Sequence, residues 1–177
     1  MGSIKRVAIT GPESTGKSML AEHLANHYKT VWVPEYARAY LGEIKRPYGE
    51  SDILEIAKGQ VLAEAKMIPL ADRIIFCDTE LIVTKIWSEV KYQCCDPWIL
   101  DNILQQGYDL YLLCDIDLPW EYDPLREHPH MRAGLFELYR RELTDRKFPF
   151  AVIGGYGPLR LEHAVGEIDR LMQKEHE

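Results

Sequence analysis

Short apolar runs alternate along the chain with longer segments whose apolar residues recur every three or four positions. The short runs are rich in β-branched residues and are bounded by glycine, proline or aspartate, a pattern that predicts strands. The longer segments have the periodicity of helices with one buried face. The predicted strands are 4–10, 30–35, 73–80, 108–117 and 148–155, and the predicted helices are 17–28, 51–71, 96–107 and 157–173.

The run 108–117 is almost continuously apolar, which is typical of a strand covered on both faces. Strands of this kind that alternate with helices indicate a mostly parallel sheet between helical layers, an α/β fold with three layers. In such sheets a ligand binds beyond the carboxyl ends of the strands. We therefore expect the functional residues to follow the strands directly.

The helix ends carry local signals. Ser51 and Asp52 predict the N-terminal cap of the helix 51–71. Gly107 predicts the end of the helix 96–107, and Pro158 predicts the start of the last helix. The face of the helix 17–28 that is expected to be buried contains Met19, Leu20, Leu24 and Ala25.

The composition favours a single acidic domain over residues 1–177. The chain is 46% hydrophobic, and its formal net charge is −7. Binding to nucleic acid or to an anionic membrane needs a basic face, so neither partner is expected. Four cysteines without regular spacing, no apolar stretch long enough to span a bilayer and no signal sequence predict a reduced, cytoplasmic protein. Homo-oligomerisation is left open.

The segment GPESTGKS, residues 11–18, fits the phosphate-binding loop pattern G-x-x-x-x-G-K-[ST]. Glycines allow the tight turn, and the N–H groups of the turn and of the following helix then face an anion. Lys17 is expected to reach the β- and γ-phosphates, and the Ser18 hydroxyl is expected to bind Mg²⁺. The predicted nucleotide-binding residues here are Gly11, Glu13, Ser14, Thr15, Gly16, Lys17, Ser18 and Met19.

Carboxylates follow two further strands. Asp78, in CDTE, resembles a Walker B aspartate that holds Mg²⁺; the alternative is an N-terminal cap of the next helix. Glu35 and Arg38, in VPEYARAY, lie one turn apart if this segment is helical. Glu35 would accept a proton from an attacking hydroxyl and Arg38 would steady the transferred group, whereas the alternative is a weak surface ion pair.

An irregular segment after the fourth strand, DLPWEYDPLREHPHMR, reads as a mobile lid over about 119–133. Arg126 and Arg132 would bring positive charge to the γ-phosphate, and Trp120 and Tyr122 would stack on a flat ring. The alternative is an ordinary surface loop. A glycine-rich turn after the fifth strand adds Tyr156 and Arg160 as weaker candidates near the nucleotide.

Several nucleotide-dependent classes are excluded by missing motifs. The chain has no N-K-x-D guanine motif, no D-x-x-G after the third strand and no L-S-G-G-Q signature. A compact kinase for a small acceptor remains, with a non-catalytic ATP- or GTP-binding switch as the rival. The acceptor carboxylate beside the phosphate loop favours the kinase, because a switch does not need it.

Five segments in order, GPESTGKS, PEYARAY, SDILEIAKGQ, CDTE and PWEYDPLRE, resemble the NadR-type kinase domain. That domain phosphorylates nicotinamide riboside to nicotinamide mononucleotide with ATP. The resemblance extends from Val7 to about Arg160, and Glu13 with the E-Y-x-R of 35–38 is its most specific part. Full-length members add an adenylyltransferase domain with an H-x-G-H motif, which is missing here, so only the kinase step is expected. Pro34 stands where some members have Trp.

The resemblance implies a nucleotide-kinase-like P-loop fold with the strand order 2-3-1-4-5, and ATP and Mg²⁺ as the cofactors. The alternative acceptor is another nucleoside or a vitamin. Either Glu35 or Asp78 would be the base. The predicted catalytic residues are Lys17, Glu35, Arg38, Asp78, Arg126 and Arg132; the acceptor-binding residues are Glu35, Tyr36, Arg38, Asp78, Trp120 and Tyr122; the metal ligands are Ser18 and Asp78; and Tyr156 borders the nucleotide.

Overall fold

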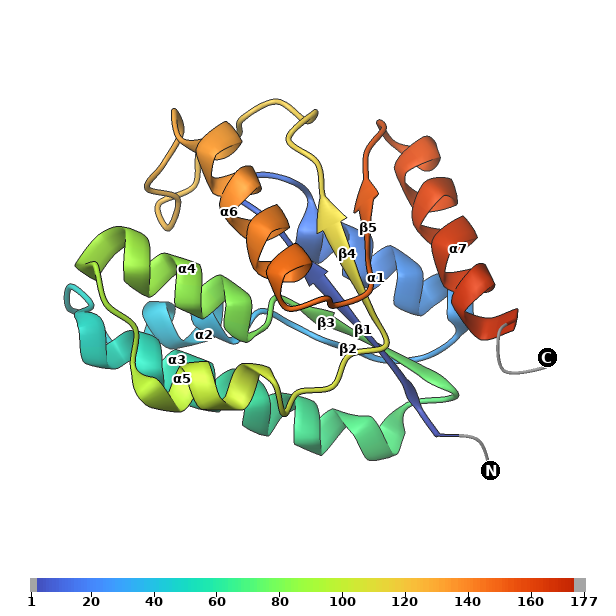
Figure 1. Ribbon diagram of the computed structural model, residues 1–177, viewed down its shortest axis with the longest axis horizontal. Helices are drawn as coiled ribbons and strands as arrows, with labels where there is room; N and C mark the ends of the chain where they lie inside the picture. The colour runs from blue at the N-terminus through green and yellow to red at the C-terminus, as the bar shows by residue number, and fades with distance from the viewer. Residues whose placement is uncertain (1–2, 174–177) are drawn as a thin grey trace.

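A five-stranded parallel sheet in the order β2-β3-β1-β4-β5 forms the centre of the molecule (Figure 1). The computed structural model describes residues 3–173. The strands are β1 (Lys5–Thr10), β2 (Trp32–Val33), β3 (Ile74–Asp78), β4 (Leu110–Cys114) and β5 (Phe150–Ile153). The predicted fold class and strand order are therefore confirmed.

Helices cover both faces of this sheet. They are α1 (Lys17–Tyr28), α2 (Tyr36–Glu43), α3 (Glu50–Met67), α4 (Leu81–Tyr92), α5 (Pro97–Ile103), α6 (Arg132–Asp145) and α7 (Pro158–Gln173), with a 3₁₀ turn at Ile68–Leu70. Helices α1 and α7 pack on one face, and α3, α4, α5 and α6 contribute to the core on the other (Figure 1). Two hydrophobic cores thus enclose the sheet, as expected for strands buried on both sides.

Strand register brings three connecting segments together at the carboxyl edge of the sheet. In β1, Ile9 pairs with Asp78 of β3, and in β2, Val33 pairs with Cys77 of β3. The residues that follow β1 and β2 therefore flank the end of β3. The parallel alignment of these strands therefore places the phosphate-binding loop and Glu35 next to Asp78.

The structure corrects three details of the predicted helices. Met19 is exposed, and the buried face of α1 is Leu20, Ala21, Leu24 and Ala25. Helix α3 begins at Glu50, because the Asp52 carboxylate accepts the Gly49 N–H at 2.8 Å from inside the first turn. Helix α5 ends at Ile103, and Gly107, with φ +60°, lies in the turn before β4.

Helix α6 was not predicted. Leu135, Tyr139 and Leu143 recur every four residues and are its buried positions, but the other positions are mostly polar or charged. Within residues 3–173, no helix combines the length and the apolar character needed to cross a bilayer. The four cysteines, all within the described residues, are free thiols.

Candidate active site

The loop after β1 turns sharply between two glycines. Gly11 has φ +131°, and a Cβ there would lie 3.0 Å from the carbonyl oxygen of Cys114 in β4. Gly16 has φ +75° and is the N-cap of α1. Both conformations lie in the left-handed region that favours glycine, so each of the two motif glycines is required by its own backbone conformation.

The loop is held in shape from within. The Lys17 ammonium donates to the Pro12 carbonyl at 2.7 Å, and the Thr15 hydroxyl donates to the same oxygen at 2.8 Å. Because α1 begins at Lys17, the positive end of its dipole and its free N–H groups point at the loop. The loop therefore has the geometry and charge of an anion site.

Arg160 braces this loop from α7. Its guanidinium donates to the Thr15 carbonyl at 2.8 Å and to the Asp115 carbonyl at 3.1 Å, and it pairs with the Asp117 carboxylate at 2.7 Å. The Arg160 side chain is buried. The sequence marked Arg160 only as a weak candidate; the structure shows that it ties the phosphate-binding loop to the segment after β4.

Asp78 lies at the end of β3 with almost no exposure to solvent. Burial and the nearby Glu35 carboxylate raise the pKa of Asp78 to about 6, against the opposing effects of the Ser18 hydroxyl and the Lys17 ammonium. Its Oδ1 atom is buried and has no hydrogen-bond partner among the described residues. The cap of α4 is instead Glu80, whose carboxylate accepts the Ile82 N–H at 2.6 Å. Asp78 is thus not used as a helix cap.

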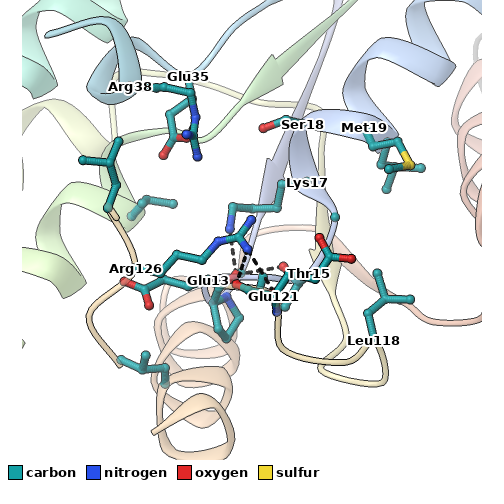
Figure 2. A pocket seen from close by; sticks show the side chains of 18 of the residues that line it. Glu13, Thr15, Lys17, Ser18, Met19, Glu35, Arg38, Leu118, Glu121 and Arg126 are labelled. Carbon is teal, nitrogen blue, oxygen red and sulfur yellow. Dashed lines mark hydrogen bonds and ion pairs between the residues drawn. The ribbon is translucent and has the colours of Figure 1, made fainter. Parts of the chain in front are cut away.

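Glu35 and Arg38 form the predicted pair. Glu35 is the N-cap residue of α2, and its carboxylate lies 3.9 Å from Arg38 Nε. The other end of the Arg38 guanidinium reaches Asp123 of the lid at 3.0 Å. Figure 2 shows Glu35 and Arg38 on one side of the pocket, with Lys17 between them and Arg126.

The lid, residues 119–133, rests on the phosphate-binding loop. The Glu13 carboxylate accepts the backbone N–H groups of Glu127 and His128, each at 3.1 Å. The Ser14 hydroxyl accepts the Glu121 N–H at 2.9 Å and a bond from Arg126 at 3.3 Å. The irregular segment is therefore docked onto the loop by specific polar contacts.

One pocket of about 850 Å³ joins these groups. Its polar end is formed by the phosphate-binding loop with Glu35, Arg38 and Arg126, and Arg160 also lines the pocket. Its other end is apolar and has two aromatic residues. That end is lined by Ala37, Leu41, Val83, Ile86, Trp87, Val90, Leu125, Leu135 and Tyr139. A polar phosphate end and an apolar ring end in one cavity suit a two-substrate site.

Four predicted aromatic contacts lie elsewhere. Tyr36 packs on α3, where a Cβ at Gly59 would collide with its ring. Tyr122 is 85% exposed, and neither it nor Trp120 lines the pocket. The Tyr156 hydroxyl donates to the Asp117 carbonyl, also outside the lining. Trp120 and Tyr122 therefore do not line this pocket, and their expected ring stacking stays a prediction.

The other predicted site residues divide into two groups. The nucleotide-binding residues Gly11 to Met19 all line the pocket. Arg132 lies outside the lining, where it donates to the carbonyls of Ser14 and Leu118 at 3.1 and 2.8 Å. Arg132 therefore holds the base of the lid, and Arg126 is the lid arginine that faces the cavity.

Trp87 and Tyr139 were missed as pocket residues. Both lie at helical spacing among apolar neighbours, Trp87 on α4 and Tyr139 on α6, so the sequence pattern does not separate them from core residues. Pro34 precedes Glu35 and Tyr36, at the position where some members of the NadR-type family have Trp. Trp87 supplies an aromatic side chain to the cavity of this chain.

Asp78 and Ser18 fit a Mg²⁺ site. The unpartnered buried Asp78 oxygen and the Ser18 hydroxyl are oxygen donors of the kind that Mg²⁺ prefers. Residues 3–173 contain no cluster of three His, Cys, Asp or Glu side chains suited to a metal. Mg²⁺ usually binds through one or two protein ligands together with substrate phosphates, which is compatible with this pair.

Comparison with known proteins gives a consistent family. A family model described as an AAA domain (AAA_28) matches residues 6–158. The trifunctional NAD biosynthesis/regulator protein NadR of Salmonella typhimurium is 31% identical over 130 residues, which are 70% of this chain and 31% of that protein. The Escherichia coli protein of the same name is 32% identical with the same coverage. The chain thus spans less than a third of the length of these relatives.

Solved structures share the fold. NadR protein in complex with NR matches with a TM-score of 0.84 and 23% identity over 95% of this chain and 50% of that chain. Thymidylate kinase from Ehrlichia chaffeensis matches with a TM-score of 0.62 and 14% identity over 97% of this chain and 100% of that chain. At these identities the likeness shows a common fold.

Replacement of Arg160 should destabilise the protein strongly. Arg160→Ala removes a buried cation and leaves the Thr15 and Asp115 carbonyls without their donor, so we expect a loss on the order of 3 kcal/mol in the free energy of unfolding. Urea unfolding at pH 7 measures it. Arg170→Ala, which removes an exposed ion pair from the same helix, is the matched control and should cost no more than about 0.5 kcal/mol. Equal losses in the two variants would contradict the bracing role.

Proposed function

The chain belongs to the AAA-domain family, and on this basis and its resemblance to the NadR-type kinase domain we propose that it is an ATP-dependent small-molecule kinase. The reaction transfers the γ-phosphoryl group of ATP to an alcohol. The acceptor that we propose is nicotinamide riboside, whose 5′-hydroxyl would be phosphorylated to give nicotinamide mononucleotide.

The two-ended pocket carries this proposal. The phosphate-binding loop and Glu35 belong to the polar end, and an apolar wall with Trp87 and Tyr139 forms the other. A protein that only bound and released a nucleotide would need the first end alone. The acceptor half and the carboxylate beside it therefore support phosphoryl transfer over a binding switch.

The donor end is arranged for ATP. The backbone N–H groups of the loop and the first turn of α1 would bind the phosphate oxygens, and Lys17 would leave the Pro12 carbonyl to bind them too. Arg126, which lines the pocket from the lid, would face the charge that develops on the transferred group. These groups would supply most of the catalysis, because phosphoryl transfer depends mainly on positioning and charge stabilisation.

The geometry favours Glu35 as the base. Glu35 lines the pocket and is partly exposed, whereas Asp78 is buried beside Ser18 and is not among the lining residues. In the transfer, the acceptor oxygen bonds to the γ-phosphorus as the bond from that phosphorus to the β–γ bridging oxygen breaks. The hydroxyl proton passes to the Glu35 carboxylate, and ADP leaves.

Asp78 and Ser18 would hold Mg²⁺. The ion, when bound, would neutralise negative charge on the ATP phosphates. Arg38 has a separate role in this assignment: it lies beside Glu35 and pairs with Asp123, so it orients the base and connects it to the lid. Base, metal ligands and lid would then act around one γ-phosphate.

The acceptor assignment has two supports. NadR proteins are relatives by sequence, and a NadR protein that shares this fold has been solved in complex with NR. An aromatic wall near carboxylates also suits a cationic pyridinium ring. A single cytoplasmic kinase domain over residues 1–177, with a small-molecule substrate and no nucleic-acid partner, stays part of the proposal.

Acceptor-dependent ADP release is the first test. Wild-type protein with Mg²⁺-ATP should release ADP rapidly with nicotinamide riboside and slowly without it. Lys17→Ala should lower kcat by a factor on the order of 100, because it removes a cation that stabilises developing charge. Lys58→Ala, on the exposed side of α3, is the control and should keep wild-type turnover.

A coupled assay with other nucleosides and vitamins in parallel identifies the acceptor. Turnover that depends on a different nucleoside would retain the kinase assignment and replace nicotinamide riboside as the proposed acceptor. Slow ATP hydrolysis at a rate that no acceptor changes, or full turnover by Lys17→Ala, would contradict the kinase assignment.

The metal assignment predicts a pH dependence. A carboxyl group binds Mg²⁺ in its ionised form, and the pKa of Asp78 is raised to about 6, so the rate at limiting Mg²⁺ should fall as the pH drops through 6. Asp78→Asn should remove this dependence and raise the Mg²⁺ concentration for half-maximal rate by at least about tenfold. Asp101→Asn on the exposed side of α5 is the control. An Asp78→Asn variant with a wild-type Mg²⁺ requirement would overturn the assignment.

A further inference from the structure

Tyr48 joins the lid to the apolar wall of the pocket. It lies in the connection between α2 and α3, and its hydroxyl donates to the Glu127 carboxylate of the lid at 2.8 Å. The same hydroxyl accepts the indole N–H of Trp87 at 3.0 Å and a bond from the Lys91 ammonium. One phenol oxygen therefore connects the lid, helix α4 and a pocket-lining aromatic ring.

Further contacts hold the side chains around the Tyr48 hydroxyl in place. The rings of Tyr48 and Trp87 meet edge to face, with centroids 5.1 Å apart. The Lys91 ammonium lies 3.9 Å from the centre of the Tyr48 ring and pairs with the Glu127 carboxylate at 2.8 Å. Charge-assisted hydrogen bonds of this kind are stronger than neutral ones and hold their partners in a defined geometry.

Glu127 is held at both ends. Its backbone N–H donates to Glu13 of the phosphate-binding loop, whereas its carboxylate binds Tyr48 and Lys91. Glu127 and Trp87 both line the pocket, but Tyr48 is not among the lining residues. Tyr48 can therefore influence a bound molecule only through these two neighbours.

We propose that Tyr48 is a positioning residue that sets acceptor affinity by locking Trp87 to the lid. The inference rests on the proposed function, since it assigns the Trp87 end of the pocket to the acceptor. When the lid is docked on the phosphate-binding loop, Glu127 presents its carboxylate to the Tyr48 hydroxyl, and that hydroxyl fixes the indole ring. Docking of the lid over the ATP site thereby fixes the aromatic wall of the acceptor site.

The lid keeps its other attachments to the donor end without Tyr48. Glu13 binds two lid N–H groups, Ser14 binds Glu121, and Arg132 binds the Ser14 carbonyl. Loss of the Tyr48 hydroxyl should therefore loosen the acceptor side of the lid and leave the ATP side in place. This difference separates a positioning role from general destabilisation.

Tyr48→Phe, which keeps the ring and removes only the hydroxyl, is the test. We expect the KM for the acceptor to rise three- to tenfold while the KM for ATP and the melting temperature stay near the wild-type values. Hydrogen exchange with Mg²⁺ and a non-hydrolysable ATP analogue should be several-fold faster in the peptide 123–131 and unchanged in α7. The control is Tyr92→Phe, because the Tyr92 hydroxyl makes no hydrogen bond within residues 3–173.

Two results would overturn the inference. One is an acceptor KM within twofold of wild type, or one that rises together with the KM for ATP and a lower melting temperature. The other is wild-type exchange in the peptide 123–131 of Tyr48→Phe. If the wild-type protein phosphorylates no acceptor, the proposed function fails, and the exchange experiment alone then decides whether Tyr48 ties down the lid.

Discussion

Close contact between the start of the phosphate-binding loop and strand β4 is the constraint on which the site depends. Gly11 follows β1 with φ +131°, and the space of its missing side chain is filled by the Cys114 backbone. β1 pairs with β3 on one side and β4 on the other, so the loop emerges at the middle of the sheet. Any side chain at Gly11 would push the loop away from β4 and from the end of β3, where Asp78 lies.

From this fixed point the rest of the site is assembled by three attachments. Arg160 anchors the loop to the segments after β4 and β5. The lid docks on the loop through Glu13 and Ser14, and Arg38 connects the lid to Glu35. The phosphate-binding loop, Glu35 and the lid are thus connected by polar contacts.

The sequence was most informative where structure is local. The glycine, lysine and serine spacing of the loop indicated its shape, because the turn and the helix dipole depend only on neighbouring residues. The carboxylates at Glu35 and Asp78 were predicted from their place after strands, since parallel strands bring their ends together. The strand order came from the resemblance to the NadR-type kinase domain, because strand periodicity does not specify which strands are neighbours.

Residues whose roles depend on distant contacts were not predictable in the same way. Trp87 has the spacing of a core residue, and only the packing of α4 against α6 shows that it faces a cavity. Tyr36 is turned away because Gly59 offers it a place on α3. Arg160 is separated from Thr15 by 145 positions, so no local pattern relates them. Helix α6 was missed because its three buried apolar positions are outnumbered by charged ones.

A crystal structure with Mg²⁺ and a non-hydrolysable ATP analogue tests the central claim most directly. The account predicts the β- and γ-phosphates within hydrogen-bond distance of the loop N–H groups and Lys17, the ion on Ser18 and Asp78, and Glu35 facing the γ-phosphate across the free half of the pocket. A nucleotide bound elsewhere on the molecule, or Glu35 and Asp78 both turned away from its terminal phosphate, would contradict it.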